Sequence, residues 1–156
     1  MNTSIRRAEQ KDIETIQEFG SKLLNYERKN FDSSLDSDWA FSDEAKAEYL
    51  DAIQNKYVSI AETDGRPIGF LIGSIIEPKI SDARQIKQAY LQNLYVNENF
   101  RKAGVGKDLV ENFKEYCRNE GVKRLNVSVL AANEVAVNFY NTVGFKPRSL
   151  NLSQAL

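Results

Sequence analysis

Residues 94–107 carry the most specific chemical pattern in this chain of 156 residues. They read as the end of a strand, a short loop with Arg101 and Lys102, glycines at 104 and 106, and the start of a helix. Glycine lets the backbone approach a ligand closely. The free N–H groups of a helix's first turn attract anions, and the helix dipole adds to that attraction. The pattern therefore indicates an anion site, and pyrophosphate is a natural occupant.

The loop alone also fits a plain turn before a helix. It lacks the Gly-Lys-Ser/Thr sequence of a nucleotide-binding phosphate loop and the third glycine of a dinucleotide fingerprint. Arg101 and Lys102 are equally consistent with solvent-exposed charged residues on a surface loop. Both interpretations stay open on these residues.

The absence of histidine narrows the chemistry. It excludes Ser-His and Cys-His catalytic pairs and metal sites built on imidazole. Cys117 is the only cysteine and falls within an apolar helical pattern, which favours a core residue over a reactive nucleophile. Proton transfer must use Tyr, Glu, Asp, Lys, Cys or water, and we expect no metal.

Composition gives no sign of nucleic-acid or membrane binding. The formal net charge is -1, which produces no strong overall field. No apolar run approaches the about 20 residues that a membrane span needs, and the first residues do not resemble a signal peptide. We expect a cytoplasmic protein that binds neither nucleic acid nor membranes.

Hydrophobic periodicity and turn signals predict the elements that position the loop. The expected helices are Gln10–Leu24, Asp43–Gln54, Val105–Cys117 and Asn133–Val143, the last with Asn133 as its N-cap. Residues 26–42 and 77–88 read as loops. The expected strands are Ser4–Arg7, Tyr57–Glu62, Ile68–Ile76, Ala89–Val96, Leu125–Leu130 and a short Ser149–Leu152. The order βααβββαβαβ predicts an α/β (α+β) fold, with one domain over residues 1–156.

Two segments resemble the GNAT superfamily of N-acetyltransferases. Arg-x-x-Gly-x-Gly after a Leu-Tyr-Val strand, at 94–106, is similar to that family's coenzyme A signature. Residues 133–145 resemble its later motif, Asn…Ala-x-x-Phe-Tyr-x-x-x-Gly-Phe. The similarity covers about residues 89–145. It implies a GNAT-like domain with a central mixed sheet flanked by helices, and acetyl-CoA as cosubstrate.

The resemblance also implies residue roles. The backbone around Leu94 and Val96 pairs with the pantetheine arm, the backbone from Arg101 to Lys107 holds the pyrophosphate, and Asn133 contacts the coenzyme. The implied cofactor-binding residues are Leu94, Tyr95, Val96, Arg101, Lys102, Ala103, Gly104, Val105, Gly106, Lys107, Asn133 and Tyr140.

Tyr140 is the implied catalytic residue, a general acid that protonates the departing thiolate in direct transfer to an amine. A core aromatic is the alternative at this position. A backbone N–H near Val96 polarises the thioester carbonyl. Residues 89–94 contain no carboxylate to act as general base, so the base stays open among Glu27, Glu62, Glu77 and a water chain.

Residues 26–51 hold eight carboxylates against three cations, together with five aromatic residues. In the family this segment borders the acceptor cleft, so we predict a cationic acceptor, a small-molecule or peptide amine. The alternative is a solvated helix and loop whose aromatics cap the core. A coenzyme A-binding module without catalysis and an interaction domain are the competing functions. Homodimerisation stays open.

Overall fold

The computed structural model describes residues 2–77 and 86–156. Residues 78–85 of the predicted loop lie outside the described residues. Five strands form one sheet in the order β1-β2-β3-β4-β5. The first four are antiparallel neighbours, and β5 runs parallel to β4. The predicted mixed sheet of an α+β fold is confirmed. The strands are Thr3–Arg7 (β1), Tyr57–Thr63 (β2), Arg66–Ile76 (β3), Gln88–Val96 (β4) and Arg124–Val127 (β5).

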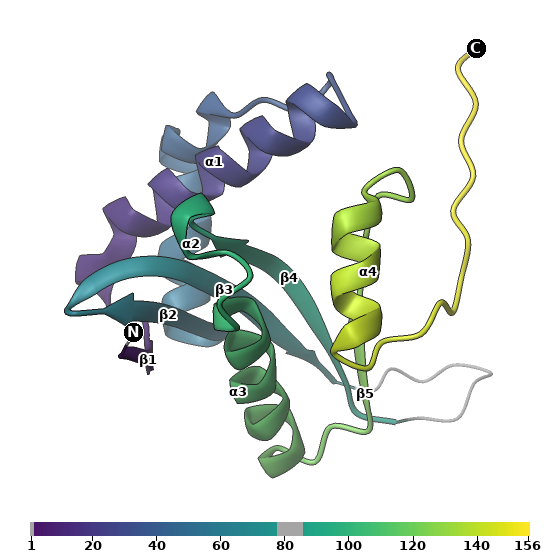
Figure 1. Ribbon diagram of the computed structural model, residues 1–156. Coiled ribbons are helices and arrows are strands. Elements are labelled where there is room, and N and C mark those ends of the chain that lie inside the picture. The colour runs from purple at the N-terminus through teal and green to yellow at the C-terminus, as the bar shows by residue number, and fades with distance from the viewer. Residues whose placement is uncertain (1, 78–85) are drawn as a thin grey trace.

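Four α-helices cover the two faces of the sheet (Figure 1). Alternate residues of β3 show the division, because Leu71 packs in the α3 core whereas Phe70 and Ile72 pack in the α1 and α2 core. Since successive side chains of a strand point to opposite faces, these are two separate cores on either side of the sheet. The helices are Ile13–Asn30 (α1), Asp43–Asn55 (α2), Val105–Asn119 (α3) and Glu134–Thr142 (α4).

Helix α1 is longer than its sequence pattern predicts. The prediction ended the helix at Leu24, where the apolar periodicity stops, but the helix continues to Asn30. Residues 25–30 contain neither glycine nor proline, so nothing in the backbone interrupts the helix. The extension places Tyr26 and Glu27 on a rigid helix instead of a loop.

The predicted strand Ser149–Leu152 is wrong. Residues 145–156 form no regular element, and Leu150 and Leu152 are 76% and 80% exposed. Alternating leucines suit a strand, but a strand also needs a neighbour for its backbone groups. In this structure the tail runs away from the sheet (Figure 1), and β5, which ends at Val127 instead of the predicted Leu130, pairs with β4 alone among the described residues.

Strands β4 and β5 separate halfway along β4. Their pairing ends at Leu91 and Val127. Immediately afterwards the register between β3 and β4 shifts by one residue, which leaves Gln92 as a β-bulge. A bulge bends the strand and increases its local twist. Residues 92–96 therefore diverge from β5 and present a free backbone edge.

At the opposite edge of the sheet, Arg6 binds two carboxylates. Its guanidinium lies 2.8 Å from Asp12 and 2.7 Å from Glu62. Asp12 is only 5% exposed and also accepts the Glu9 N–H at 2.8 Å. Hydrogen bonding to Arg6 holds the pKa of Asp12 below its ordinary value, so this contribution to stability is present at neutral pH and is lost as the pH falls through that lowered pKa.

We expect Asp12→Ala to destabilise the protein by about 2 kcal/mol, because it removes one of the two carboxylates that bind the partly buried Arg6 guanidinium and leaves the Glu9 N–H without its acceptor. In thermal unfolding this is a drop in Tm of about 4–8 °C at pH 7. Glu18→Ala is the control, because the exposed Glu18–Lys22 ion pair contributes about 0.5 kcal/mol or less. Equal drops for the two variants would contradict the assigned role of Asp12.

Candidate active site

The glycine loop leads into an uncapped helix N-terminus. Helix α3 begins after Gly104, which has a left-handed φ of 89°, and no side chain caps it. The first backbone bond runs from the Asp108 N–H to the Gly104 carbonyl at 3.0 Å. The N–H groups of residues 105–107 precede it and therefore have no acceptor within the helix. Three aligned donors at the positive end of the helix dipole are a suitable arrangement for binding an anion.

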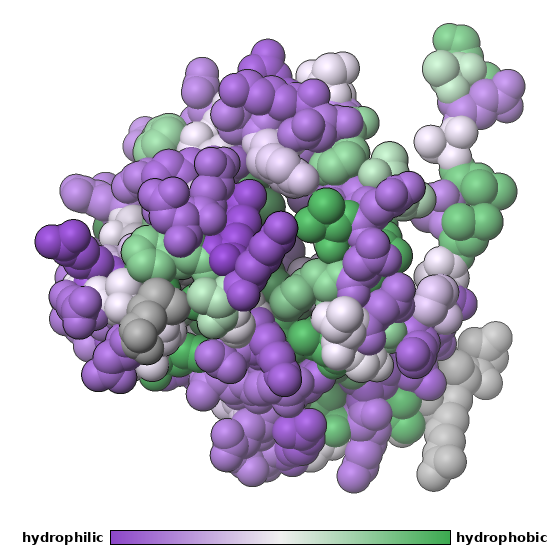
Figure 2. Space-filling view, viewed as in Figure 1, coloured by the Kyte–Doolittle hydropathy of each residue, from purple (hydrophilic) through white to green (hydrophobic). Residues whose placement is uncertain are grey.

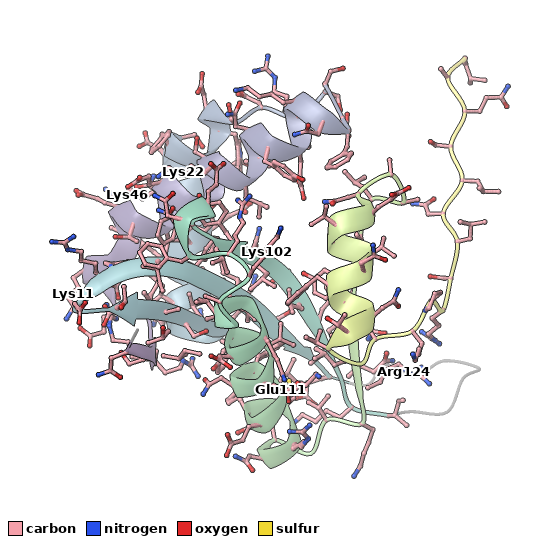
Figure 3. All side chains as sticks on the ribbon, viewed as in Figure 1. Lys11, Lys22, Lys46, Lys102, Glu111 and Arg124 are labelled. Carbon is pink, nitrogen blue, oxygen red and sulfur yellow. The ribbon has the colours of Figure 1, made fainter. Side chains whose placement is uncertain are left out.

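The loop itself is open to solvent. Residues 101–104 and Lys107 are exposed, whereas Val105 is buried in the α3 core. Lys102 also has a left-handed φ of 62°, so the chain reverses sharply twice before the helix. Figure 3 places Lys102 on this loop, above the start of α3. A phosphate at the helix N-terminus would meet exposed cations and no covering element among the described residues.

The free edge of β4 exposes the backbone of two predicted residues. The Asn97 N–H donates to the Ile68 carbonyl at 2.8 Å, and bonded pairs alternate along an antiparallel ladder. In the register of β3 with β4, Tyr95 therefore bonds to β3, whereas Leu94 and Val96 direct their backbone groups toward the side that β5 leaves open. An extended ligand can add there as an extra strand and run toward the N-terminus of α3.

Two predicted cofactor residues have other partners in the structure. The Tyr95 side chain is buried against Phe19 of α1, with ring centroids 5.1 Å apart, and its backbone faces β3. The Arg101 Nε donates to the Val96 carbonyl at 2.9 Å, and its guanidinium lies 5.8 Å from the rings of both Tyr26 and Tyr95. Arg101 thus connects the loop to the ends of β4 and α1.

We call the open edge of β4 at residues 92–96, together with the N-terminus of α3, the groove. Helix α4 packs against the start of α3 beside it. The predicted N-cap is confirmed, because the Asn133 side chain accepts the Ala136 N–H at 3.1 Å. Farther along α4, the Phe139 ring lies close to Gly106 of α3. A Cβ atom added to Gly106 would be 3.4 Å from this ring. An added side-chain carbon would thus be in van der Waals contact with Phe139, which shows that α4 packs closely against the start of α3 at this glycine.

Tyr140 follows Phe139 on α4 and lies partly buried between aromatic rings. Its ring packs edge-on against Phe139 and Phe145, at centroid distances of 5.2 and 5.5 Å. Burial raises the pKa of the Tyr140 hydroxyl well above its ordinary value, and the negative charge of Glu27 raises it further. The phenol therefore keeps its proton at neutral pH and remains a hydrogen-bond donor.

The structure separates the three carboxylates considered as bases. Glu62, on β2, forms an ion pair with Arg6 of β1. Glu77 is exposed, and its carboxylate lies 3.7 Å from the ammonium of Lys87, which directly precedes β4. Glu27 alone among them acts on Tyr140. Burial, and secondarily the charge of Asp32, raises the pKa of the Glu27 carboxyl.

The acidic segment 26–51 is partly explained by local structure. Ser42 caps α2, and Asp43 and Glu44 lie in its first turn, where their charges suit the helix dipole. Trp39 packs against the buried Tyr49, with ring centroids 6.3 Å apart. Both rings belong to the α1 and α2 core, which leaves fewer aromatic faces for a ligand than the sequence suggested.

Other features of the molecule are not lined by the glycine loop or the open edge of β4. A cavity of about 940 Å³ runs along β5 and the ends of α3 and α4, lined by Tyr140 but by no residue from 92 to 107. Cys117 is buried, as predicted, and burial raises the pKa of its thiol to about 11. Within residues 2–77 and 86–156 no group of three potential metal ligands occurs, and no helix is long and apolar enough to cross a membrane.

Comparison with known proteins defines the class. A sequence model of the acetyltransferase (GNAT) family matches residues 21–145, which is most of the chain. The chain therefore belongs to the GNAT acetyltransferase family, and the predicted membership is confirmed.

Individual relatives share a part of the sequence. An uncharacterized N-acetyltransferase of Methanocaldococcus jannaschii is 26% identical over 91 residues, which cover 58% of this chain and 39% of that protein. The thialysine N-epsilon-acetyltransferase of Mus musculus is 31% identical over 37% of this chain and 34% of its own length. The aminoglycoside N(6')-acetyltransferase type 1 of Salmonella typhimurium is 25% identical over 56% and 60%. The chain thus spans less than two thirds of these relatives.

Solved structures share the whole fold at low identity. A tetramutant of the BH1408 protein from Bacillus halodurans superposes with a TM-score of 0.89 and 19% identity, covering 98% of this chain and 99% of that one. The aminoglycoside N-acetyltransferase AAC(6')-Iy in complex with CoA gives a TM-score of 0.73 and 19% identity, covering 99% and 95%. At this identity the likeness establishes the fold.

Proposed function

We propose that the protein is an N-acetyltransferase that moves an acetyl group from acetyl-CoA to a primary amine. One observation supports this most directly: the open backbone edge at Leu94 and at the Val96 N–H leads to the uncapped N-terminus of α3. The edge suits an extended arm with amide groups, and the helix end suits a pyrophosphate. Coenzyme A combines these two features in one molecule.

Each part of the groove has a role in this mechanism. The N–H groups of residues 105–107 hold the pyrophosphate, with Lys102 and Lys107 adding charge, and Asn133 contacts the coenzyme with the amide NH2 that its cap does not use. The Val96 N–H polarises the thioester carbonyl. Tyr140 gives its proton to the departing sulfur. Holding the amine and the thioester together supplies much of the rate.

Turnover of acetyl-CoA against a panel of amines tests the proposal. We expect release of free thiol that depends on one or more primary amines, together with binding of acetyl-CoA in calorimetry. Binding without turnover would make the protein a coenzyme A-binding module. The absence of both binding and turnover would contradict the assignment of the groove.

We propose that the acceptor is a cationic small molecule or peptide amine. Asp36 and Asp38 lie in the exposed turns between α1 and α2, in a segment of net negative charge. The relatives named for aminoglycosides and thialysine are consistent with an amine of this kind.

The acceptor KM is expected to rise with ionic strength, since exposed charges are screened over about 10 Å at 0.1 M. The double variant Asp36→Asn, Asp38→Asn should raise the acceptor KM about two- to fivefold and leave the acetyl-CoA KM unchanged. Steady-state kinetics over a salt series measure both. A preference for neutral or acidic amines, or no effect of salt, would contradict a cationic acceptor while leaving acetyl transfer in place.

A further inference from the structure

Helix α1 brings a carboxylate to the groove from the far face of the sheet. Ile16, Gly20 and Leu23 form the inward stripe of α1, packed on the α1 and α2 core. Glu27 lies one turn farther along the same stripe, at the spacing that keeps residues on one helix face. An acid thus takes the position where the pattern calls for an apolar side chain.

The end of α1 is held over the end of β4. Tyr26, the neighbour of Glu27, lies under the Arg101 guanidinium, 5.8 Å from its ring. Arg101 in turn is bonded to the Val96 carbonyl. The C-terminal end of α1, which carries Glu27, therefore lies near the end of the open edge.

Glu27 and Tyr140 come from helices on opposite faces of the sheet, yet the charge of Glu27 acts on the Tyr140 hydroxyl. An intact sheet would stand between α1 and α4. Here β5 ends at Val127 and residues 92–96 diverge from it, so the two helices face one another past the end of the pairing. Figure 1 shows α1 and α4 on either side of β4, and Figure 2 shows apolar residues gathered between their polar surfaces.

We propose that the Glu27 carboxylate binds the ammonium group of the acceptor and takes its proton, opposite the Tyr140 hydroxyl. This inference rests on the proposed function, because it assigns the base that acetyl transfer to an ammonium requires. Glu62 and Glu77, the other carboxylates considered, are bound elsewhere.

The protons balance over one turnover. The ammonium loses its first proton to Glu27, and the neutral amine then forms the C–N bond as the C–S bond breaks. Tyr140 gives its proton to the sulfur and recovers one from the new amide nitrogen. Glu27 finally releases its proton to water, so one proton leaves for each amide formed.

The pairing also couples the base to the acid. While ionised, Glu27 raises the pKa of Tyr140. Once Glu27 has accepted a proton, that charge is gone and Tyr140 becomes the better donor as the thiolate departs. The titratable groups that act on the pair are Asp32, after the end of α1, together with Glu27 and Tyr140 themselves.

The test compares Glu27→Gln with wild type, using the polyamine, amino sugar or lysine peptide that gives wild type its highest kcat/KM. We expect the acceptor kcat/KM of the variant to fall about 10- to 100-fold at pH 7 and the acetyl-CoA affinity to stay within about twofold. Raising the pH toward the pKa of the amine, about 10 for a lysine-like group, should restore most of the loss, because free amine then needs no base. Glu27→Asp should retain part of the activity.

Glu14→Gln is the matched control, an exposed glutamate on the same helix, and should behave as wild type. A second readout is Tm. Since the folded state raises the pKa of Glu27, ionised Glu27 costs stability as the pH rises through that value. Glu27→Gln should therefore melt at a higher temperature than wild type at pH 7, and this difference should disappear at a pH low enough to protonate the carboxyl in both the folded and the unfolded state.

The outcomes separate the two proposals. A wild type without turnover on any amine would overturn the proposed function and this inference with it. An active wild type with a fully active Glu27→Gln would overturn the inference alone. A loss that is equal at every pH, or that comes with a lower Tm at pH 7, would make Glu27 structural and overturn it as well.

Discussion

Gly104→Glu is expected to abolish binding of coenzyme A while the protein stays folded. A carboxylate at this position would lie where the phosphate belongs, at the start of α3. Two unit charges about 4 Å apart near a protein surface repel by about 4 kcal/mol, which corresponds to about a 1,000-fold loss of affinity. Calorimetry with coenzyme A measures this loss.

Gly104→Gln is the matched control for the backbone. The φ of 89° costs any side chain about 1–2 kcal/mol, and both variants carry that strain equally. A Cβ there would meet only Asp108, whose Oδ2 lies 4.0 Å away, so both side chains have room. We expect Gly104→Gln to weaken binding less than about tenfold, because it lacks the negative charge. Affinity of the wild-type level in folded Gly104→Glu would move the phosphate site elsewhere.

Tyr140→Phe is expected to lower turnover by about 10²–10⁴-fold, the usual range for general acid–base catalysis. The variant keeps the ring that packs against Phe139 and Phe145 and removes only the hydroxyl. The low end of that range is favoured, because a thiolate is a modest leaving group to stabilise. Acetyl-CoA affinity should change little, since the coenzyme's other contacts remain.

The pH profile gives a second measure of Tyr140. Its raised pKa keeps the phenol protonated below about pH 10, the ordinary value, so wild-type kcat should not fall between pH 7 and 9. Tyr116→Phe is the control, a tyrosine on α3 packed against Phe113 and Tyr57, and should retain full activity. Full turnover by Tyr140→Phe would mean that this residue only packs.

Local chemistry was readable in the sequence. The glycine loop, the start of α3 and the Asn133 cap each lie within a few consecutive residues, so glycine content, helix signals and apolar spacing predict them without the rest of the fold. The same applies to β3 and β4, whose β-branched and aromatic runs give the strands their correct places. The motifs at 94–106 and 133–145 together indicated the family, which the match over residues 21–145 confirms.

Errors arose where an element depends on its neighbours. Residues 149–152 have the alternation of a strand, but in the structure they lie beside no partner. Residues 26–30 lack the apolar period and were predicted to be loop, although their backbone continues the helix. A strand needs a neighbouring strand for its backbone hydrogen bonds, whereas a helix forms them within itself. The sequence pattern therefore placed the end of α1 too early and predicted a last strand that does not form.

Only the tertiary structure pairs the proposed base, Glu27, with the proposed acid, Tyr140. The bulge at Gln92 leaves no mark in the sequence, because it follows from how β4 fits β3. That bulge and the early end of β5 open the sheet, and the extra turns of α1 carry Glu27 to the opening. Glu27 and Tyr140 are far apart in the chain and lie on opposite sides of the sheet. The arrangement proposed for them therefore depends on strand register and helix length, which packing of the whole domain decides.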